Sequence, residues 1–457
     1  MSFPKYAEYV DSGVEWLEAS PSNWGLFLGK RLFKQRKEKA YPRDEQLAAS
    51  QAFGVVPQKK MMTLTGNKVM LALGGTDTFR HVEENDFVIS LRSFEGGIEH
   101  SAYTGCVSPA YTVLTSIHTI VPLFYKYLFK SRPYIAALQA STDSLRDGKS
   151  ITFEQFGAIP LPNPSISEQT QIARFLDHET AKIDALIAEQ KRLIKLLQEK
   201  RQAVISHAVT KGLDPNVPMK DSGVEWLGEV PAHWRLSKLK FLIERLIDTE
   251  HKTVPFDDDG DFYVARTSDI RNGKLDLNDA RRTDSEGYTE WTKRGAPRKG
   301  DIIFTREAPA GEACIVPVDD KICLGQRTVL IKLNEDLLIS GFTLWSIYGG
   351  LASRFIKELS QGSTVSHINM SDIPNTPILL PPLNEQVDID RYLMSMTGKY
   401  DLLMIESERL MLRLTERRSA IISAAVTGKI DVRNWQPPAD ESAFDGDVRK
   451  VGLEASA

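Results

Sequence analysis

Two short segments contain residue types that could do chemistry, but neither carries a complete catalytic motif. Asn163-Pro164-Ser165 begins like the Asn-Pro-Pro-aromatic motif that holds a flipped adenine in methyltransferases, but lacks its second proline and its aromatic residue. Gly148-Lys149-Ser150 ends like a nucleotide-binding glycine loop, yet Asp143 stands where that motif requires its first glycine. The eight histidines form no HExxH or other close metal-binding pair. The sequence therefore predicts a chain with no catalytic site, metal or cofactor of its own.

Composition describes a globular protein of several domains. A length of 457 residues suggests two to four domains, and 42% hydrophobic with 26% charged residues is typical of a folded, soluble chain. The most apolar run, residues 111–129, is interrupted by His118, Pro122 and Lys126, so we expect buried strand and helix there rather than a membrane span. The formal net charge of -4 gives no support by itself to a nucleic-acid partner.

The termini and the cysteines bear on location and on cross-links. The N-terminal sequence MSFPKYAEY lacks the layout of a secretory signal, which favours the cytoplasm. Cys106, Cys314 and Cys323 contain no CxxC pair, so neither a disulfide framework nor a four-ligand zinc site is encoded. Residues 432–457 are polar and acidic, and we expect a flexible tail.

The sequence repeats itself twice. DSGVEWLEASPSNW at residues 11–24 returns as DSGVEWLGEVPAHW at residues 221–234. Residues 168–214 also align with residues 385–431 without a gap. Internal repeats fix an architecture before any motif does. The chain is therefore a tandem duplication in which an opening phrase, a variable stretch and a conserved segment each occur twice.

Each conserved segment has the pattern of a long helix. Both are rich in Leu, Ile, Glu, Lys, Arg and Ala without an internal proline, and each carries a heptad seam. A helix from residue 168 to 211 would be about 65 Å long. The seam positions are Ile172, Leu176, Ile183, Leu186, Gln190, Leu193, Leu197 and Val204 in the first copy, and Ile389, Leu393, Tyr400, Leu403, Ser407, Leu410, Leu414 and Ile421 in the second.

The two helices could pair in parallel or antiparallel. We predict an antiparallel pair, because it relates the duplicated halves by a pseudo-twofold axis and places the two variable regions at opposite ends. Gln190 and Ser407 occupy equivalent positions near the helix midpoints, where a buried polar pair can fix the register.

The variable regions predict mixed α/β domains. NDFVISLR (85–92) and GDIIFTREAPAG (300–311) are strand-like runs, and each is followed by a second apolar run, at residues 111 and 328. The predicted fold class is therefore α+β, with two globular domains of mixed sheet and two long coiled-coil helices. The predicted segments are 1–160, 161–214 (helix), 215–377, 378–431 (helix) and the tail 432–457.

The combination of these features resembles one family, the specificity subunit of type I restriction-modification systems. The resemblance is carried by the repeated DSGVEWL phrase, by the proline-rich IPLPNPSISEQ (159–169) and ILLPPLNEQ (378–386), and by the paired heptad helices. The first proline-rich segment departs from the family's usual form, because it has two extra residues before its glutamate. The resemblance implies two target-recognition domains, each reading one half of a split DNA site, held apart by two antiparallel helices.

The resemblance also implies the partners and the chemistry that they supply. Such a subunit has no catalytic site, binds double-stranded DNA and recruits two methyltransferase subunits, with restriction and translocase subunits joining for cleavage in a bacterial or archaeal cytoplasm. The methyltransferase subunits use S-adenosylmethionine to methylate adenine, and the restriction subunits use ATP and Mg. Because the two variable regions differ, a non-palindromic site is expected. Because the chain is not basic, we expect weak DNA binding alone and tighter binding in the complex.

If the resemblance holds, arginine, lysine and amide side chains on expected loops are the candidates for DNA contact. A solvated surface charge is the commoner role for any one of them, so the prediction rests on clusters. The candidates are Lys30, Arg31, Lys34, Arg36, Arg80, His81 and Arg92 in the first domain, and Arg266, Arg271, Asn272, Arg294, Arg298, Lys299 and Arg306 in the second. The alternative is a coiled-coil structural adaptor whose globular domains bind protein.

Overall fold

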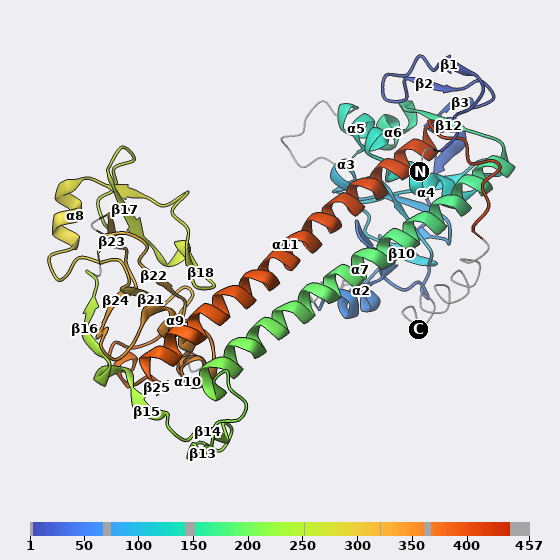
Figure 1. The fold of residues 1–457 in the computed structure, drawn as a ribbon. Helices are drawn as coiled ribbons and strands as arrows, with labels where there is room; N and C mark the ends of the chain where they lie inside the picture. The colour runs from blue at the N-terminus through green and yellow to red at the C-terminus, as the bar shows by residue number, and fades with distance from the viewer. Residues whose placement is uncertain are drawn as a thin grey trace. The chain divides into compact units, whose positions relative to one another are not determined.

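The computed structural model describes residues 3–66, 75–141, 151–250, 252–319, 321–360 and 367–438 (Figure 1). The described residues form two compact units. Unit 1 is built from the chain up to Gln190 and from Arg409 onwards, and unit 2 is Lys191–Glu408. Each unit therefore contains one variable region and a part of each long helix. The Gly148-Lys149-Ser150 segment and tail residues 439–457 lie outside the described residues.

Unit 1 is organised around an antiparallel four-stranded sheet with the order β4-β11-β8-β9. Its centre is fully buried, since Val88, Val113 and Leu114 are 0% exposed. These strands are β4 (Phe33–Gln35), β11 (Thr112–Ser116), β8 (Phe87–Ile89) and β9 (Glu99–His100). The smaller pairs are β1 (Tyr9–Asp11) with β2 (Ala19–Pro21), β3 (Gly25–Leu28) with β12 (Pro160–Asn163), β5 (Leu47–Ser50) with β6 (Gly54–Pro57), and β7 (Arg80–Val82) with β10 (Gly105–Val107).

Unit 2 repeats this topology. Its four-stranded sheet has the order β16-β24-β21-β22, again antiparallel throughout. These strands are β16 (Ile243–Asp248), β24 (Thr328–Leu333), β21 (Ile302–Thr305) and β22 (Ala313–Ile315). The smaller sheets contain β13 (Met219–Asp221) with β14 (Glu229–Pro231), β15 (Arg235–Lys238) with β25 (Pro377–Leu380), β18 (Ile270–Arg271) with β19 (Lys274–Leu275), and β20 (Arg282–Thr283) with β17 (Phe262–Ala265) and β23 (Ile322–Leu324). The units differ where β17 pairs with β23 in parallel, whereas β7 and β10 are antiparallel.

Helices complete both units, and the mixed α+β class predicted from the sequence is confirmed. In unit 1 these are α1 (Gly29–Leu32), α2 (Gln58–Thr65), α3 (Ser93–Gly96), α4 (Pro122–Phe129), α5 (Arg132–Ala140) and α6 (Phe153–Ala158). In unit 2 they are α8 (Ser285–Trp291), α9 (Ser340–Tyr348), α10 (Gly350–Ser360) and the 3-10 turns η1 (Leu239–Phe241), η2 (Thr267–Asp269) and η3 (Ile373–Asn375).

The long helices are α7 (Ile166–Lys211) and α11 (Leu383–Val426), and their packing within each unit is antiparallel. In unit 1, Arg418 Nε donates to Asp184 Oδ1 at 2.8 Å, and the start of α7 packs against the end of α11. In unit 2, Arg201 Nε donates to Asp401 Oδ1 at 3.0 Å. The 217-residue repeat converts one ion pair into the other with its partners exchanged, as antiparallel pairing of duplicated helices requires.

The predicted heptad seam is buried unevenly. Its core positions in the first copy are Ile172, Leu176, Ile183 and Leu197, and in the second Ile389, Leu393, Ser407, Leu414 and Ile421. Gln190, Val204 and Tyr400 are half-buried. The leucines at the alternate seam positions are 41–53% exposed, namely Leu186, Leu193, Leu403 and Leu410. A two-helix pair covers only one side of each helix, so in each unit these leucines remain exposed to solvent.

The repeated opening phrase mounts each variable region on a long helix. Trp24 Nε1 donates to Glu168 Oε1 at 2.9 Å, and Trp234 Nε1 donates to Glu385 Oε2 at 2.8 Å. Trp24 is 6% exposed and Trp234 is 0% exposed, so each indole N–H has its partner in a buried setting. In each unit the opening phrase therefore packs the chain onto a long helix.

The glutamine beside each of these glutamates makes a second connection between a long helix and its unit. Gln169 Oε1 accepts the backbone N–H of Val121 at 2.8 Å, and Gln386 Oε1 accepts that of Ile339 at 3.1 Å. Val121 and Ile339 are the N-cap residues of α4 and α9, so the same side chain ties the same element of each unit to a long helix.

Candidate nucleic-acid interface

The sequence candidates of the first domain divide into exposed and buried groups. Lys30, Arg31 and Lys34, on α1 and β4, are exposed, as is Arg92 at the start of α3. Arg80 is half-buried, and its Nε donates to Pro109 O at 3.3 Å. These five side chains are accessible to a ligand.

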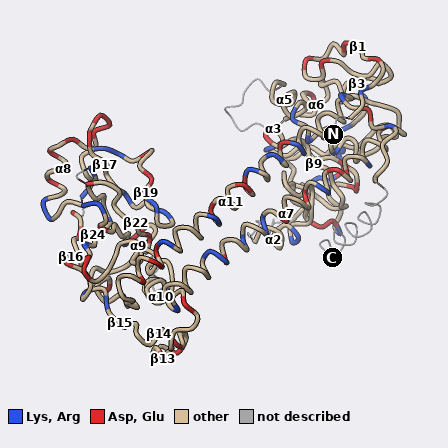
Figure 2. The backbone as a smooth tube through the Cα atoms, in the orientation of Figure 1, with Lys and Arg blue, Asp and Glu red and all other residues tan. Residues whose placement is uncertain are grey.

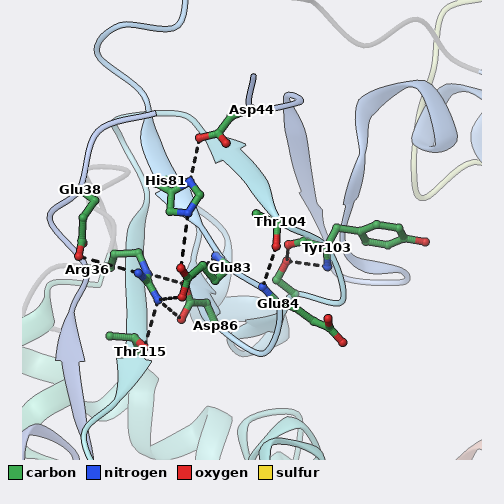
Figure 3. A network of polar contacts seen from close by, with 11 residues as sticks. Arg36, Glu38, Asp44, His81, Glu83, Glu84, Asp86, Tyr103, Thr104 and Thr115 are labelled. Atoms are coloured by element: carbon green, nitrogen blue, oxygen red, sulfur yellow. Dashed lines mark hydrogen bonds and ion pairs between the residues drawn. The ribbon is translucent and has the colours of Figure 1, made fainter. Parts of the chain in front are cut away.

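Arg36 and His81 instead belong to an ion-pair network (Figure 3). Arg36 Nε donates to Asp86 Oδ2 at 2.7 Å, and its NH2 group donates to Glu83 Oε2 at 2.7 Å. His81 Nδ1 lies 2.8 Å from Asp44 Oδ2. The Arg36 side chain is 11% exposed and that of His81 is 6% exposed. Both side chains are engaged in holding β4, β7 and the turn before β8 together.

The electrostatics of this network are those of a structural site. Burial raises the pKa of Asp86, and the hydrogen bonds from Arg36 oppose that rise. Because desolvating a carboxylate is costly unless a cation compensates it, the guanidinium of Arg36 favours the ionised form of Asp86 inside the unit.

Arg306 of the second domain is placed in the same way. It is 9% exposed, its Nε donates to Ile368 O at 3.0 Å, and its NH1 lies 3.3 Å from Asp248 Oδ1. Arg266 is half-buried and forms a two-pronged pair with Asp269, at 3.0 Å and 2.8 Å. Neither guanidinium is directed freely to solvent.

The remaining candidates of the second domain are exposed. Arg271 and Asn272 lie at the β18-β19 turn, where Asn272 has a φ of 51°. Arg294, Arg298 and Lys299 follow α8, and Arg294 NH2 pairs with Glu250 at 2.9 Å. Figure 2 shows that Lys and Arg positions are interspersed with Asp and Glu positions along the backbone of each unit.

The structure adds basic residues that the sequence candidates omit. Three cations stack on aromatic rings around β17 and β20. The guanidinium of Arg281 lies 4.3 Å from the ring centre of Phe256, that of Arg282 lies 4.8 Å from Tyr263, and the Lys321 ammonium lies 5.3 Å from Phe262. Arg327 and Gln326 lie nearby, between β23 and β24. In the sequence, the adjacent arginines at 281–282 and the turn LGQR at 324–327 are the features that could have identified these residues.

Of the two segments that resembled catalytic motifs, Asn163-Pro164-Ser165 makes structural contacts, and Gly148-Lys149-Ser150 lies outside the described residues. Asn163 ends β12, and its Oδ1 accepts hydrogen bonds from Tyr125 Oη and Gln169 Nε2, both at 2.9 Å. Within the described residues, no group of three or more His, Cys, Asp or Glu side chains is placed to hold a metal ion. None of the described helices combines the length and apolarity that crossing a membrane requires.

Comparison with known proteins defines the class. Residues 234–406 match the family model of the type I restriction modification DNA specificity domain. The chain is 23% identical over 322 residues to the type I restriction enzyme EcoBI specificity subunit of Escherichia coli, covering 68% of this chain and 66% of that protein. It is 23% identical over 362 residues to the MjaVIII specificity subunit of Methanocaldococcus jannaschii, covering 77% of this chain and 81% of that protein.

Two solved structures share the fold. The HsdS subunit from Thermoanaerobacter tengcongensis aligns with a TM-score of 0.52 and 17% identity, over 90% of this chain and 98% of that one. A chain from a structure described as the basis of complex assembly and conformational transition of the type I R-M system aligns with a TM-score of 0.66 and 16% identity, over 89% and 98%. Over most of its length the chain is therefore similar to type I restriction-modification specificity subunits.

Proposed function

We propose that this chain is the DNA-recognition subunit of a type I restriction-modification complex, and that it reads a bipartite, non-palindromic site with its two variable regions. The observation that carries the proposal is the duplicated scaffold with divergent surfaces. Both units repeat the same sheet order and the same Trp-to-Glu mount, while their loop residues differ. A symmetric reader matches a palindrome, whereas two different readers on one scaffold match two different half-sites.

The proposed partners are two adenine methyltransferase subunits and the restriction subunits, with this chain itself non-catalytic. The exposed leucines of the long helices support a protein partner, because apolar side chains repeated along a helix face bind other helices. On α7 these are Leu186 and Leu193, and on α11 they are Leu403 and Leu410, with the members of each pair seven residues apart. S-adenosylmethionine, ATP and Mg are accordingly cofactors of the partners in this proposal.

The test is a methylation map. The host's adenine methylation is sequenced with and without the gene for this chain, and the tagged chain is purified to identify what binds it. We expect a methyltransferase partner and loss of methylation at one split sequence when the chain is absent. Unchanged methylation, or purification of unrelated proteins alone, would instead favour the coiled-coil adaptor.

A second test concerns the spacer between the half-sites, which we propose is set by the long helices. Deleting one matched heptad from α7 and one from α11 shortens each by about 10 Å, or about three base pairs. The preferred spacer should then change. The control is a variant with seven substitutions in each helix that keep its length. A shortened variant that keeps both its activity and its preferred spacer would refute the proposal that the long helices set the spacer.

A further inference from the structure

A polar hollow in unit 2 lies beside the turn that joins β23 to β24. It has a volume of about 280 Å³. Its lining includes Thr253, Phe256, Arg266, Ser268, Gln326 and Arg327. We call this cavity the turn hollow. We propose that the turn hollow is a base-reading site for double-stranded DNA in the second domain, with Gln326 and Arg327 as the specificity-determining residues. This inference rests on the proposed function and goes beyond it by naming the site.

The backbone of the turn is held firmly on both sides. Gly325 N donates to Ala265 O at 2.8 Å, which ties the turn to β17, and Arg306 N donates to Arg327 O at 2.9 Å. A Cβ atom at Gly325 would lie 2.9 Å from Ala265 O, so the close approach requires glycine. Side chains presented from such a fixed turn keep their geometry when a ligand arrives, which is what base reading needs.

The conformation of Arg327 points to a role for its side chain. Its φ is 69°, in the left-handed region that favours glycine. Strain of this kind is concentrated at functional sites. Glycine would adopt this backbone conformation without strain. The arginine instead places a long, charged side chain at the rim of the hollow.

The two side chains have the chemistry that base edges require. The Arg327 side chain is 54% exposed, and its Nε lies 3.1 Å from Glu307 Oε2, which orients the guanidinium while using only one edge. Gln326 Nε2 donates to Thr253 Oγ1 at 3.1 Å, which fixes the amide. Arginine binds O6 and N7 of guanine in a forked pair, and glutamine binds N6 and N7 of adenine.

The surroundings supply contacts to the DNA backbone. Phe256 lines the hollow, and the exposed Arg281 stacks on its ring. Exposed cations positioned beside a base-reading turn neutralise phosphates, which adds affinity without sequence information. Arg281 therefore gives a control in which binding weakens and specificity does not change.

The corresponding turn of unit 1 is different. It joins β10 to β11, and its residues 108–111 are Ser-Pro-Ala-Tyr without a charged side chain. The two domains therefore differ in the residue types carried by equivalent turns. Such a difference is what a non-palindromic site demands.

The experiment maps methylated sites genome-wide for the assembled complex with variants of the full chain. Arg327→Ala and Gln326→Ala should each make one position of one half-site degenerate, with discrimination there falling about ten- to hundred-fold. Arg327→Gly serves as the folding control, because glycine accepts a φ of 69° and should keep the fold while losing the same discrimination. Lys293→Ala, an exposed cation on the neighbouring loop, should leave the motif unchanged.

The outcomes separate this inference from the function on which it rests. A split motif in the parent complex that stays identical in the Arg327 and Gln326 variants overturns the base-reading site alone. Uniformly weaker methylation at every sequence, as expected for Arg281→Ala, overturns it as well, because it reports a phosphate contact. A parent complex without any split motif contradicts the proposed function itself.

Discussion

Replacing Arg36 tests whether this arginine holds the fold or touches DNA. Asp86 is 3% exposed and takes two hydrogen bonds from Arg36, at 2.7 Å and 3.2 Å. Removing one partner of a buried ion pair costs about 3–5 kcal/mol, because the other charge stays buried. Glu83, with a side chain 55% exposed, adds little, since surface pairs contribute about 0–1 kcal/mol. We therefore expect Arg36→Ala to lower the free energy of unfolding of unit 1 by about 3–4 kcal/mol.

The assay is urea unfolding of the full chain, followed by hydrogen exchange at the amides of β8 and β11. The matched control is Lys34→Ala on the same part of the chain, which is exposed and should change stability by no more than about 0.5 kcal/mol. Adding Asp86→Asn to Arg36→Met should restore much of the loss, because the buried charge disappears with its partner. If Arg36→Ala abolishes DNA binding at unchanged stability, our structural assignment of Arg36 is wrong.

The pH dependence of the same loss has a definite sign. Burial raises the pKa of Asp86, so the folded state holds the proton on this carboxyl more tightly than the unfolded state does. Without Arg36 the pKa rises further, and the missing cation matters less once Asp86 is protonated. The destabilisation by Arg36→Ala should therefore be smaller near pH 4 than at pH 7, and an equal loss at both values would contradict the assignment.

Three further predictions use other buried groups. Glu168→Ala should destabilise unit 1 by about 2–4 kcal/mol in urea unfolding, because two buried donors lose their acceptor, whereas the exposed Glu199→Ala should not. Gln386→Glu should expose the amides of α9 to exchange, because a carboxylate faces backbone carbonyls in place of the donating amide, and unchanged protection would count against this link. Burial raises the pKa of Glu99 to about 7 and lowers that of His100 to about 4. Stability followed from pH 4 to 7 should therefore rise with pH in Glu99→Gln and fall in His100→Asn, and parallel profiles would refute this.

The scaffold could be predicted from sequence because its information is local or duplicated. The helical pattern beginning at residue 168 corresponds to α7, which begins at Ile166, and both strand-like runs after an acidic turn became the buried strands β8 and β21. The duplication of the tryptophan phrase in the sequence matches its equivalent packing on the helices in both units. The seam was only partly informative, since heptad periodicity identifies an apolar stripe but not how much of it a single partner helix covers.

The roles of individual charges could not be predicted, because their partners lie far away along the chain. Arg36 meets Asp86 across 50 residues, and Arg306 meets Asp248 across 58. Local sequence does not distinguish a basic residue that pairs with a distant carboxylate from one that stays free. The positive φ of Arg327 was equally hidden, because arginine carries no turn signal of the kind that glycine or asparagine gives.

The duplicated design would allow one scaffold to carry the two different readers that we propose. The hydrogen bonds of Glu168 and Glu385 attach each variable region to a long helix, and the matching sheet orders fix the strands that flank the two equivalent turns. Substitutions at Gln326 and Arg327 change side chains at the rim of the turn hollow and leave the mounting contacts untouched, so the proposed specificity can change without loss of those contacts. Arg36 and Arg306 are buried in ion pairs, although arginine is a residue type that suits contact with DNA. Burial and ion pairing, rather than residue type, therefore decide which basic residues of this chain remain available for reading DNA.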